Sequence, residues 1–158
     1  MQPVAEPCIR VQSGDFDVGH ELACLQQRAG DAGAVASFVG YVRRDAAGHR
    51  DAVSGLTLEH YPGMTERALA DICQRAMLRW PLLGTTVIHR VGPLASGAQI
   101  VLVAVAARHR DAAFEACRFI MDFLKTDAPF WKKEVLASGE ERWVDARESD
   151  EMARERWC

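Results

Sequence analysis

Apolar residues recur along this chain with two different periods, and the alternation of the two predicts both helices and strands. Apolar side chains spaced three or four residues apart predict helices over residues 18–29, 64–80 and 114–124, and a short charged helix over 148–157. Asp17 has the residue type of an N-cap for the first helix, and Gly30 that of its terminator. Both ends of the first predicted helix, residues 18–29, are therefore marked in the sequence.

Short runs rich in β-branched or alternating apolar residues predict the strands. These runs cover residues 8–11, 34–42, 53–60, 85–91, 99–106, 131–136 and 142–144. The run 34–42 is apolar enough for a buried strand, and the polar residues 45–51 after it predict a loop. Gly92-Pro93 and Ser96-Gly97 predict a hairpin between 85–91 and 99–106. Because strands and helices interleave while hairpins are present, we expect an α+β fold with a mixed or antiparallel sheet.

Composition limits the class of protein and its partners. A length of 158 residues, 49% hydrophobic and 26% charged, is typical of one soluble globular domain, here residues 1–158. A net charge of -3 gives no general attraction to nucleic acid or to acidic membranes, so any anion site must be local. The first eleven residues lack a secretory signal pattern, and no apolar stretch is long enough to span a bilayer. We therefore expect a cytoplasmic protein.

The five cysteines predict neither a disulfide framework nor a zinc site, because their number is odd and no C-x-x-C spacing occurs. Cys24, Cys73 and Cys117 lie on or beside apolar helical stripes and are interpreted as small buried hydrophobic residues. No cysteine has the flanking residues of an activated nucleophile. Four of the histidines show no ligand spacing and are assigned no role: His20, His49, His60 and His89.

Three basic clusters fall at the ends of predicted elements: Arg43-Arg44, Arg108-His109-Arg110, and Lys125 with Lys132-Lys133. Element ends are where a scaffold presents functional groups, and the second cluster precedes a helix whose free N–H groups favour anions. A rigid turn at Pro129-Phe130-Trp131 would bring Lys125 towards Lys132 and create a pocket suited to a phosphate or a developing negative charge. The alternative for each cluster taken alone is a solvated surface, and the helix dipole by itself favours a lysine at position 125.

Several segments, in their order along the chain, resemble the large, catalytic subunit of molybdopterin synthase. They are Gly-Ala-Val at 33–35, Phe-Val-Gly-Tyr-Val-Arg at 38–43, Leu-Thr-Leu-Glu-His-Tyr-Pro-Gly-Met at 56–64, Val-Ile-His-Arg-Val-Gly at 87–92, His-Arg at 109–110, Ala-Phe-Glu-Ala at 113–116, Lys125, Pro-Phe-Trp-Lys-Lys-Glu at 129–134 and Trp-Val at 143–144. Any one of these motifs is weak, but their combination over residues 33–150 is specific. The resemblance implies an α/β hammerhead fold that dimerises.

The resemblance also implies a reaction and its partners. Two sulfurs pass from the thiocarboxylated C-terminus of a small ubiquitin-like carrier to cyclic pyranopterin monophosphate, which forms the dithiolene of molybdopterin in molybdenum cofactor biosynthesis. The Gly-Gly tail of the carrier enters the pocket, and two carriers on a homodimer make a heterotetramer. No cofactor, metal or catalytic cysteine is implied, and neither nucleic acid nor a membrane is expected as a partner.

Site residues follow from the resemblance position by position. Lys125 and Lys132 take the catalytic roles, in which an ammonium group protonates a leaving oxygen or stabilises developing charge. The substrate-binding positions are Tyr41, Val42, Arg43, His109, Arg110, Lys133 and Glu134. Glu134 is expected to orient Lys132, and the pocket is expected to be shared in the dimer, with Arg43 coming from the neighbouring protomer.

Two departures from the family pattern and two other functions stay open on the sequence. Asp127 stands where related sequences often carry a basic residue, and it is expected to lower the local positive potential. The loop over 44–51 is unlike the forms typical of the family. The same basic pocket would also suit a dimeric α+β module that binds a phosphorylated ligand without chemistry, or a scaffold that only docks the carrier. An aromatic-basic run at 130–133 is the only feature that favours single-stranded nucleic acid.

Overall fold

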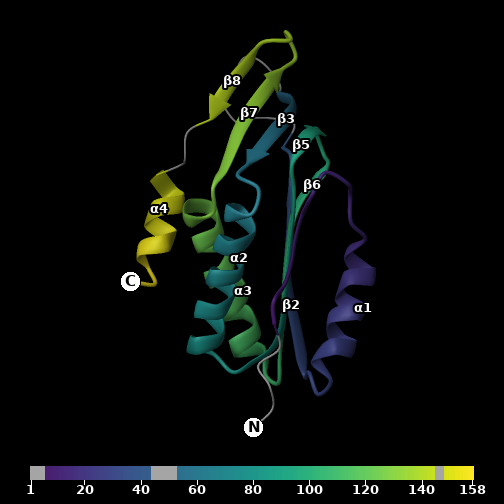
Figure 1. Ribbon diagram of the computed structural model, residues 1–158, viewed down its shortest axis with the longest axis vertical. Helices are drawn as coiled ribbons and strands as arrows, with labels where there is room; N and C mark the ends of the chain where they lie inside the picture. Colours follow the sequence, from purple (N-terminus) through teal and green to yellow (C-terminus); the bar gives the residue numbers. More distant parts are fainter. Residues whose placement is uncertain (1–5, 44–52, 145–147) are drawn as a thin grey trace.

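The computed structural model describes residues 6–43, 53–144 and 148–158, which form two β-sheets placed end to end (Figure 1). The first sheet has the strand order β1 (Cys8–Gln12), β4 (Leu82–Arg90), β6 (Gln99–Ala107), β2 (Ala34–Tyr41). The second has the order β5 (Gly92–Ala95), β3 (Val53–His60), β7 (Phe130–Leu136), β8 (Glu141–Val144). Only β1 and β4 pair in parallel among these strands. The expected α+β fold with mixed and antiparallel pairing is confirmed.

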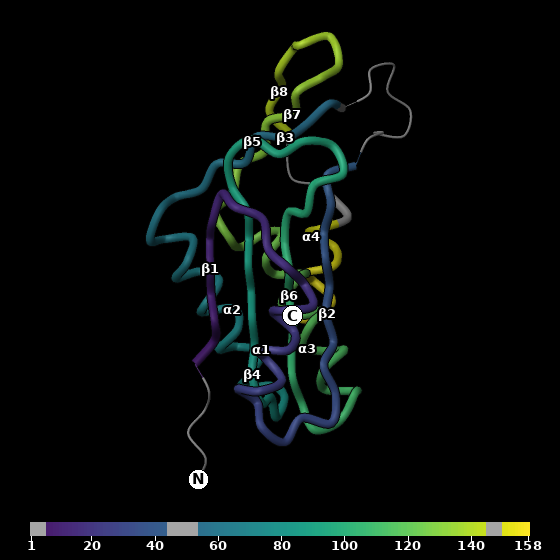
Figure 2. Tube along the Cα trace, turned by 90° about the vertical axis from the view of Figure 1, so that its right-hand side faces the viewer, coloured from purple at the N-terminus to yellow at the C-terminus, as the bar shows by residue number. Residues whose placement is uncertain are grey.

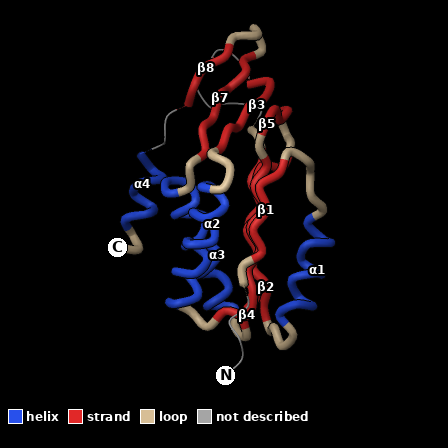
Figure 3. Tube along the Cα trace, viewed as in Figure 1, coloured by secondary structure: helices blue, strands red, loops and turns tan. Residues whose placement is uncertain are grey.

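Helices cover both faces of the first sheet (Figures 1 and 3). α1 (Val18–Ala29) packs on β4 and β6 from one side, while α2 (Met64–Arg79) and α3 (Arg110–Asp127) pack on the other side. α4 (Glu148–Glu155) packs against α3. The predicted helix start is confirmed, because the Asp17 carboxylate accepts a hydrogen bond from the His20 backbone N–H at 3.0 Å. No helix in the described ranges has the length and apolar character needed to cross a membrane.

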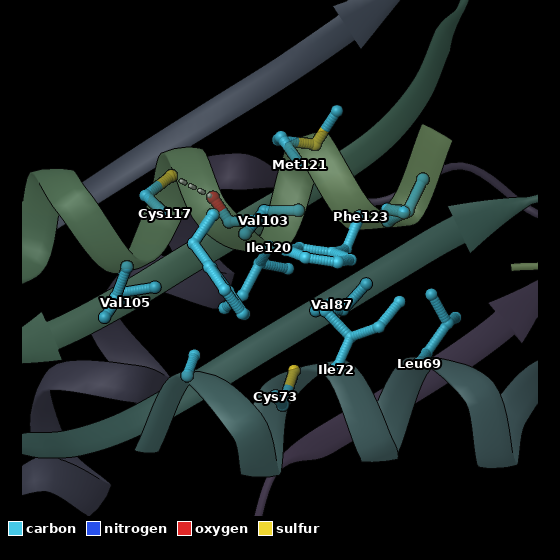
Figure 4. Close-up of a cluster of buried hydrophobic side chains, with 14 of the residues drawn as sticks. Leu69, Ile72, Cys73, Val87, Val103, Val105, Cys117, Ile120, Met121 and Phe123 are labelled. Atoms are coloured by element: carbon cyan, nitrogen blue, oxygen red, sulfur yellow. Dashed lines mark hydrogen bonds between the residues drawn. The ribbon is translucent and has the colours of Figure 1, made fainter. Parts of the chain in front are cut away.

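The alternation of side chains on the two central strands builds the core. One face of β4 and β6 contributes Val87, Val103 and Val105 to a cluster with α2 and α3 (Figure 4). The opposite face contributes Ile88 and Leu102 to a cluster with α1. Because both faces are covered, β6 is apolar at every position after Gln99, as expected for a fully buried strand, whereas β4 also buries the polar residues Thr85, Thr86 and His89. Cys73 and Cys117 lie in the first cluster, which confirms their interpretation as buried residues, whereas Cys24 is only half-buried.

Two strand predictions differ from the structure. β2 was expected to be buried, but it is an edge strand of the first sheet, and the side chains of Phe38 and Tyr41 are 42% and 55% exposed. The prediction failed because edge position depends on strand order rather than on apolar content. Between β4 and β6, which pair as predicted, the four-residue strand β5 joins the second sheet. The loop predicted over 45–51 lies outside the described residues.

The backbone before β2 passes very close to the backbone before α3, and only a glycine at position 33 leaves room for this approach. The Gly33 N–H donates to the Ala107 carbonyl at 3.0 Å, and a Cβ at this position would lie 2.1 Å from the Arg108 carbonyl oxygen. We expect Gly33→Ala to lower the free energy of unfolding by about 2 kcal/mol, because backbone must move. Gly14→Ala is the control, since no atom lies within 4 Å of a Cβ there. Chemical denaturation of both variants measures the difference, and equal stability would contradict the close approach.

Candidate active site

A fixed turn joins the end of α3, which carries Lys125, to β7, which carries Lys132. The fully buried Thr65 at the start of α2 donates its hydroxyl to the Pro129 carbonyl at 3.1 Å. The same hydroxyl accepts the Tyr61 backbone N–H at 3.0 Å. Because the turn is tied to a second helix, the direction in which β7 leaves α3 is set by the core rather than by solvent.

The side chains of β7 alternate, so Phe130 and Lys132 share one face of the strand. The Phe130 ring stacks on the imidazole of His89 from β4, with ring centroids 3.7 Å apart and an angle of 17° between the planes. Burial lowers the pKa of His89 to about 3, and the positive charges of Lys125 and Lys132 act in the same direction. Two lysines from different elements therefore both act electrostatically on one buried ring, and the lysine pocket itself stays a prediction.

Lys133 and Glu134 belong to the neighbouring hairpin of β7 and β8. The Lys133 ammonium pairs with the Glu141 carboxylate at 2.6 Å and lies 5.4 Å from the centre of the Trp143 ring. The Glu134 carboxylate accepts a hydrogen bond from the Arg142 Nε atom at 2.8 Å and forms an ion pair with the Nη2 atom of the same guanidinium at 2.7 Å. Sequence reasoning missed this arginine, although the strand spacing around Ser138-Gly139 places it opposite Glu134. The orientation of Lys132 by Glu134 stays a prediction.

The charge of Asp127 is compensated within the chain. Its carboxylate lies 2.8 Å from the Arg154 guanidinium and 3.4 Å from that of Arg75. It also accepts the Thr126 hydroxyl at 3.0 Å. The sequence alone suggested that Asp127 lowers the positive potential near Lys125; with two arginines as partners, its main effect is to hold α3, α2 and α4 together.

Tyr41, Val42 and Arg43 form the exit of β2. The Val42 side chain is 2% exposed and packs with Leu58 and Leu94, while its backbone N–H donates to the Ala98 carbonyl at 2.9 Å. Val42 therefore anchors the point at which the exposed Arg43 leaves the sheet. Figure 2 shows that β2 ends at the same end of the domain as β3, β5 and β7. Arg43 and the lysines share this end of the molecule.

His109 and Arg110 lie at the other end of α3. His109 is the N-cap residue with an extended backbone, and Arg110 is the first helical residue; both side chains are exposed. Arg110 and Lys125 are fifteen residues apart on one helix, which corresponds to about 22 Å at the α-helical rise. Within one chain, the structure thus separates His109 and Arg110 from the lysines with which they were grouped. The sequence already indicated this separation, because the helix predicted over 114–124 lies between Arg110 and Lys125.

A shallow groove of about 300 Å³ runs between β2 and α3. Its lining residues are mostly small or apolar: Ala36, Ser37, Phe38, Phe114, Cys117, Arg118, Met121 and Asp122. Met121 lies one helical turn before Lys125, so one end of the groove points towards that lysine. The apolar spacing that predicts a helix over 114–124 implies that Phe114 faces the core, but its side chain is 63% exposed at this groove. Over the described ranges, no three potential metal-ligating side chains gather.

Comparison with known proteins gives consistent matches. The family model described as "MoaE protein" matches residues 11–127. A molybdopterin synthase catalytic subunit from Ralstonia nicotianae is 59% identical over 153 residues, covering 96% of this chain and 84% of that protein. The solved structure of a molybdopterin biosynthesis MoaE protein from Burkholderia ambifaria is 50% identical, with a TM-score of 0.81, and covers 96% and 97% of the two chains. A complex of subunits 1 and 2 of molybdopterin-converting factor from Helicobacter pylori shares the fold at 21% identity, with a TM-score of 0.70 over 89% and 90% of the chains.

Proposed function

This chain belongs to the MoaE protein family and has the activity of a molybdopterin synthase catalytic subunit, and we propose how its residues divide that work. The substrate is cyclic pyranopterin monophosphate, and the sulfur donor is the thiocarboxylated C-terminus of a small ubiquitin-like carrier. The observation that carries the proposal is the approach of Lys125 and Lys132 to one buried ring from two different elements. This arrangement supplies two preorganised cations at one place.

The two lysines act on the charge that develops during sulfur transfer. The thiocarboxylate sulfur attacks the pterin side chain directly, and an oxygen leaves the carbon that is attacked. Water then hydrolyses the thioester that joins the carrier to the pterin, which leaves the sulfur on the pterin and returns the carrier with a C-terminal carboxylate. An ammonium group nearby stabilises the negative charge on that oxygen or protonates it. Because Lys132 stands on a strand and Lys125 in a helix, both are held by packed elements rather than by loops. Preorganised cations of this kind need little rearrangement during the reaction.

The groove between β2 and α3 is suited to the carrier tail. A Gly-Gly segment has no side chains and fits between small and apolar residues such as Ala36 and Cys117. A tail lying along the groove towards Met121 would present its terminal thiocarboxylate near Lys125, one turn further along α3. The lysine charge then also attracts the anionic end of the tail.

The phosphate of the substrate meets basic residues from both protomers of a homodimer. Arg43 follows the end of β2, at the end of the domain where β7 lies, whereas Arg110 lies about 22 Å along α3 from Lys125 and His109 precedes it. Sequence reasoning took Arg43 from the neighbouring protomer; the geometry favours giving that role to His109 and Arg110. The partly exposed apolar edge strand β2, with Val35 at 38% and Phe38 at 42%, is a surface that further contacts would cover.

Reconstitution tests the proposed reaction. The purified chain is incubated with cyclic pyranopterin monophosphate and a thiocarboxylated carrier, and the pterin product is analysed by mass spectrometry for two added sulfurs. A carrier with an ordinary C-terminal carboxylate is the control, because it has the same surface and no sulfur to give. Formation of the dithiolene only with the thiocarboxylated carrier is the expected result. A pterin that gains no sulfur while the carrier keeps its thiocarboxylate would refute the proposal.

None of the five cysteines is expected to carry the sulfur. Burial raises the pKa of the Cys73 thiol to about 12 and that of Cys117 to about 11, so neither forms a thiolate readily at neutral pH. We expect a variant with all five cysteines replaced by alanine or serine to keep its activity per folded dimer, although the loss of Cys73 lowers its stability. The measurement is product formed per folded dimer. A persulfide trapped on one cysteine during turnover, with activity abolished by the single Cys→Ser change, would contradict this.

A further inference from the structure

His89 is a polar side chain inside the apolar core, and neither the family motifs nor the proposed mechanism gives it a role. It lies on β4 with 5% of its surface exposed. By strand alternation it shares a face with Val87 and Thr85, which are fully buried. Buried histidines need hydrogen-bonding partners, since an unpaired polar atom in the core is costly.

The contacts of His89 fix which ring nitrogen carries the proton. Its Nδ1 atom lies 2.8 Å from the Arg90 carbonyl oxygen. A carbonyl oxygen only accepts hydrogen bonds, so Nδ1 must be the protonated nitrogen that donates. Burial lowers the pKa of the ring to about 3, and the imidazole is therefore neutral at physiological pH. A neutral ring protonated at Nδ1 has an unprotonated Nε2 atom, which is a hydrogen-bond acceptor.

The surroundings of the ring are cationic. Phe130 covers one ring face, and Lys132 follows two residues later on the same face of β7. Among the residues that the structure describes, Lys125, Lys132 and His60 are the ionisable groups whose charge acts on His89. A charged histidine here would add a third positive charge beside two lysines, whereas a neutral one offers them an acceptor without repulsion.

We propose that His89 is a positioning residue for the lysine pair, and that its Nε2 atom accepts a hydrogen bond, directly or through one water molecule, from the Lys125 or Lys132 ammonium group. The inference rests on the proposed role of the two lysines. Beyond that role, the inference states that the neutral imidazole of His89, a core residue, accepts a hydrogen bond from one lysine ammonium group and so orients it. The competing interpretation is a purely structural one, in which His89 only fills space under Phe130.

The wild-type protein provides the first test. Spectra of 15N-labelled histidine distinguish protonated from unprotonated ring nitrogens, and the His89 signals are those that disappear in a His89→Gln variant. We expect a ring that stays neutral down to about pH 4, with the proton on Nδ1. A proton on Nε2 would overturn the proposal, because that atom would then be a donor facing two cations. This test needs neither substrate nor turnover.

Lysine titration provides the second test, and the chain is suited to it because Lys125, Lys132 and Lys133 are its only lysines. Labelling lysine with 13C and 15N should give three side-chain signals. Lys133, which pairs with Glu141 on the other face of β7, serves as an internal reference. In His89→Phe we expect Lys125 or Lys132 to lose its proton at a lower pH than in the wild type, because the ammonium loses an acceptor that favours the charged form. His89→Gln, which keeps an acceptor, should restore most of the wild-type titration.

Turnover and a core control complete the design. We expect His89→Phe to lower product formation about ten-fold, with the loss greatest at high pH where the lysine is deprotonated earlier. Thr85→Val changes a buried polar side chain on the same face of β4 and should leave the lysine titrations unchanged.

Wild-type titration of both lysines in folded His89→Phe would overturn the inference. That result is distinct from failure of the proposed function, which would show as normal turnover in the lysine variants themselves. If His89→Phe does not fold, the Nε2 signal of the wild-type histidine decides: a 15N shift typical of a hydrogen-bonded acceptor supports the inference, and that of a free nitrogen would overturn it.

Discussion

Replacing Lys125 or Lys132 with alanine is expected to lower product formation by about a hundred-fold or more, because each change removes a preorganised charge from the reacting centre. Lys125 is exposed and Lys132 is half-buried on β7, so neither truncation opens a cavity in the core. The folded dimer should therefore persist while the chemistry is lost. Single-turnover formation of dithiolene, measured with saturating thiocarboxylated carrier, separates this loss from weaker carrier binding.

Arginine variants separate chemistry from charge alone. A module that only binds a phosphorylated ligand needs a positive charge at positions 125 and 132, and Lys→Arg should then serve. Proton transfer needs lysine itself, because the arginine guanidinium does not lose its proton in this pH range. Arg67→Ala on the exposed side of α2 is the control for removing a surface cation. Near-normal turnover in both alanine variants would refute the catalytic assignment.

Local sequence signals were sufficient for most elements of the first sheet and its helices. Asp17 and Gly30 delimit α1 because capping depends on residues within one turn of the helix end. The division into two sheets was not predictable in the same way. It depends on pairing between β3 and β7, where Thr57 lies opposite Lys133, far away in the sequence. The four residues of β5 include a glycine and a proline and carry no strand signal of their own.

The candidate site was predictable where its residues stand close together in the chain. Lys125 and Lys132 are separated by a short proline turn, so local geometry was enough to predict that both act on one place, as their shared influence on His89 indicates. His89 was missed because its partners Phe130 and Lys125 come about forty residues later, and a lone histidine within an apolar strand has no spacing to interpret. Asp127 pairs with Arg75 and Arg154, which lie on two other helices, so these partners could not be predicted from the sequence either.

Mixing two inactive variants is expected to restore activity if each pocket combines residues from both protomers. In a heterodimer of Arg110→Ala and Lys125→Ala, one pocket carries both changes and the other carries neither. After random subunit exchange in an equal mixture, half of the dimers are heterodimers with one intact pocket each, which gives about a quarter of wild-type activity. The expectation follows from the separation of Arg110 and Lys125 along α3, which prevents their meeting within one chain.

The matched control is a mixture of Lys125→Ala with Lys132→Ala. Both lysines lie near His89 of the same chain, so each pocket of their heterodimer still lacks one of them. This mixture should stay inactive under conditions in which mass spectrometry of the intact dimers shows exchange. Recovery in the first mixture alone assigns Arg110 to the opposite protomer from the lysines. Absence of recovery in both, with exchange demonstrated, would contradict the shared pocket, and recovery in both would place the two lysines in different pockets.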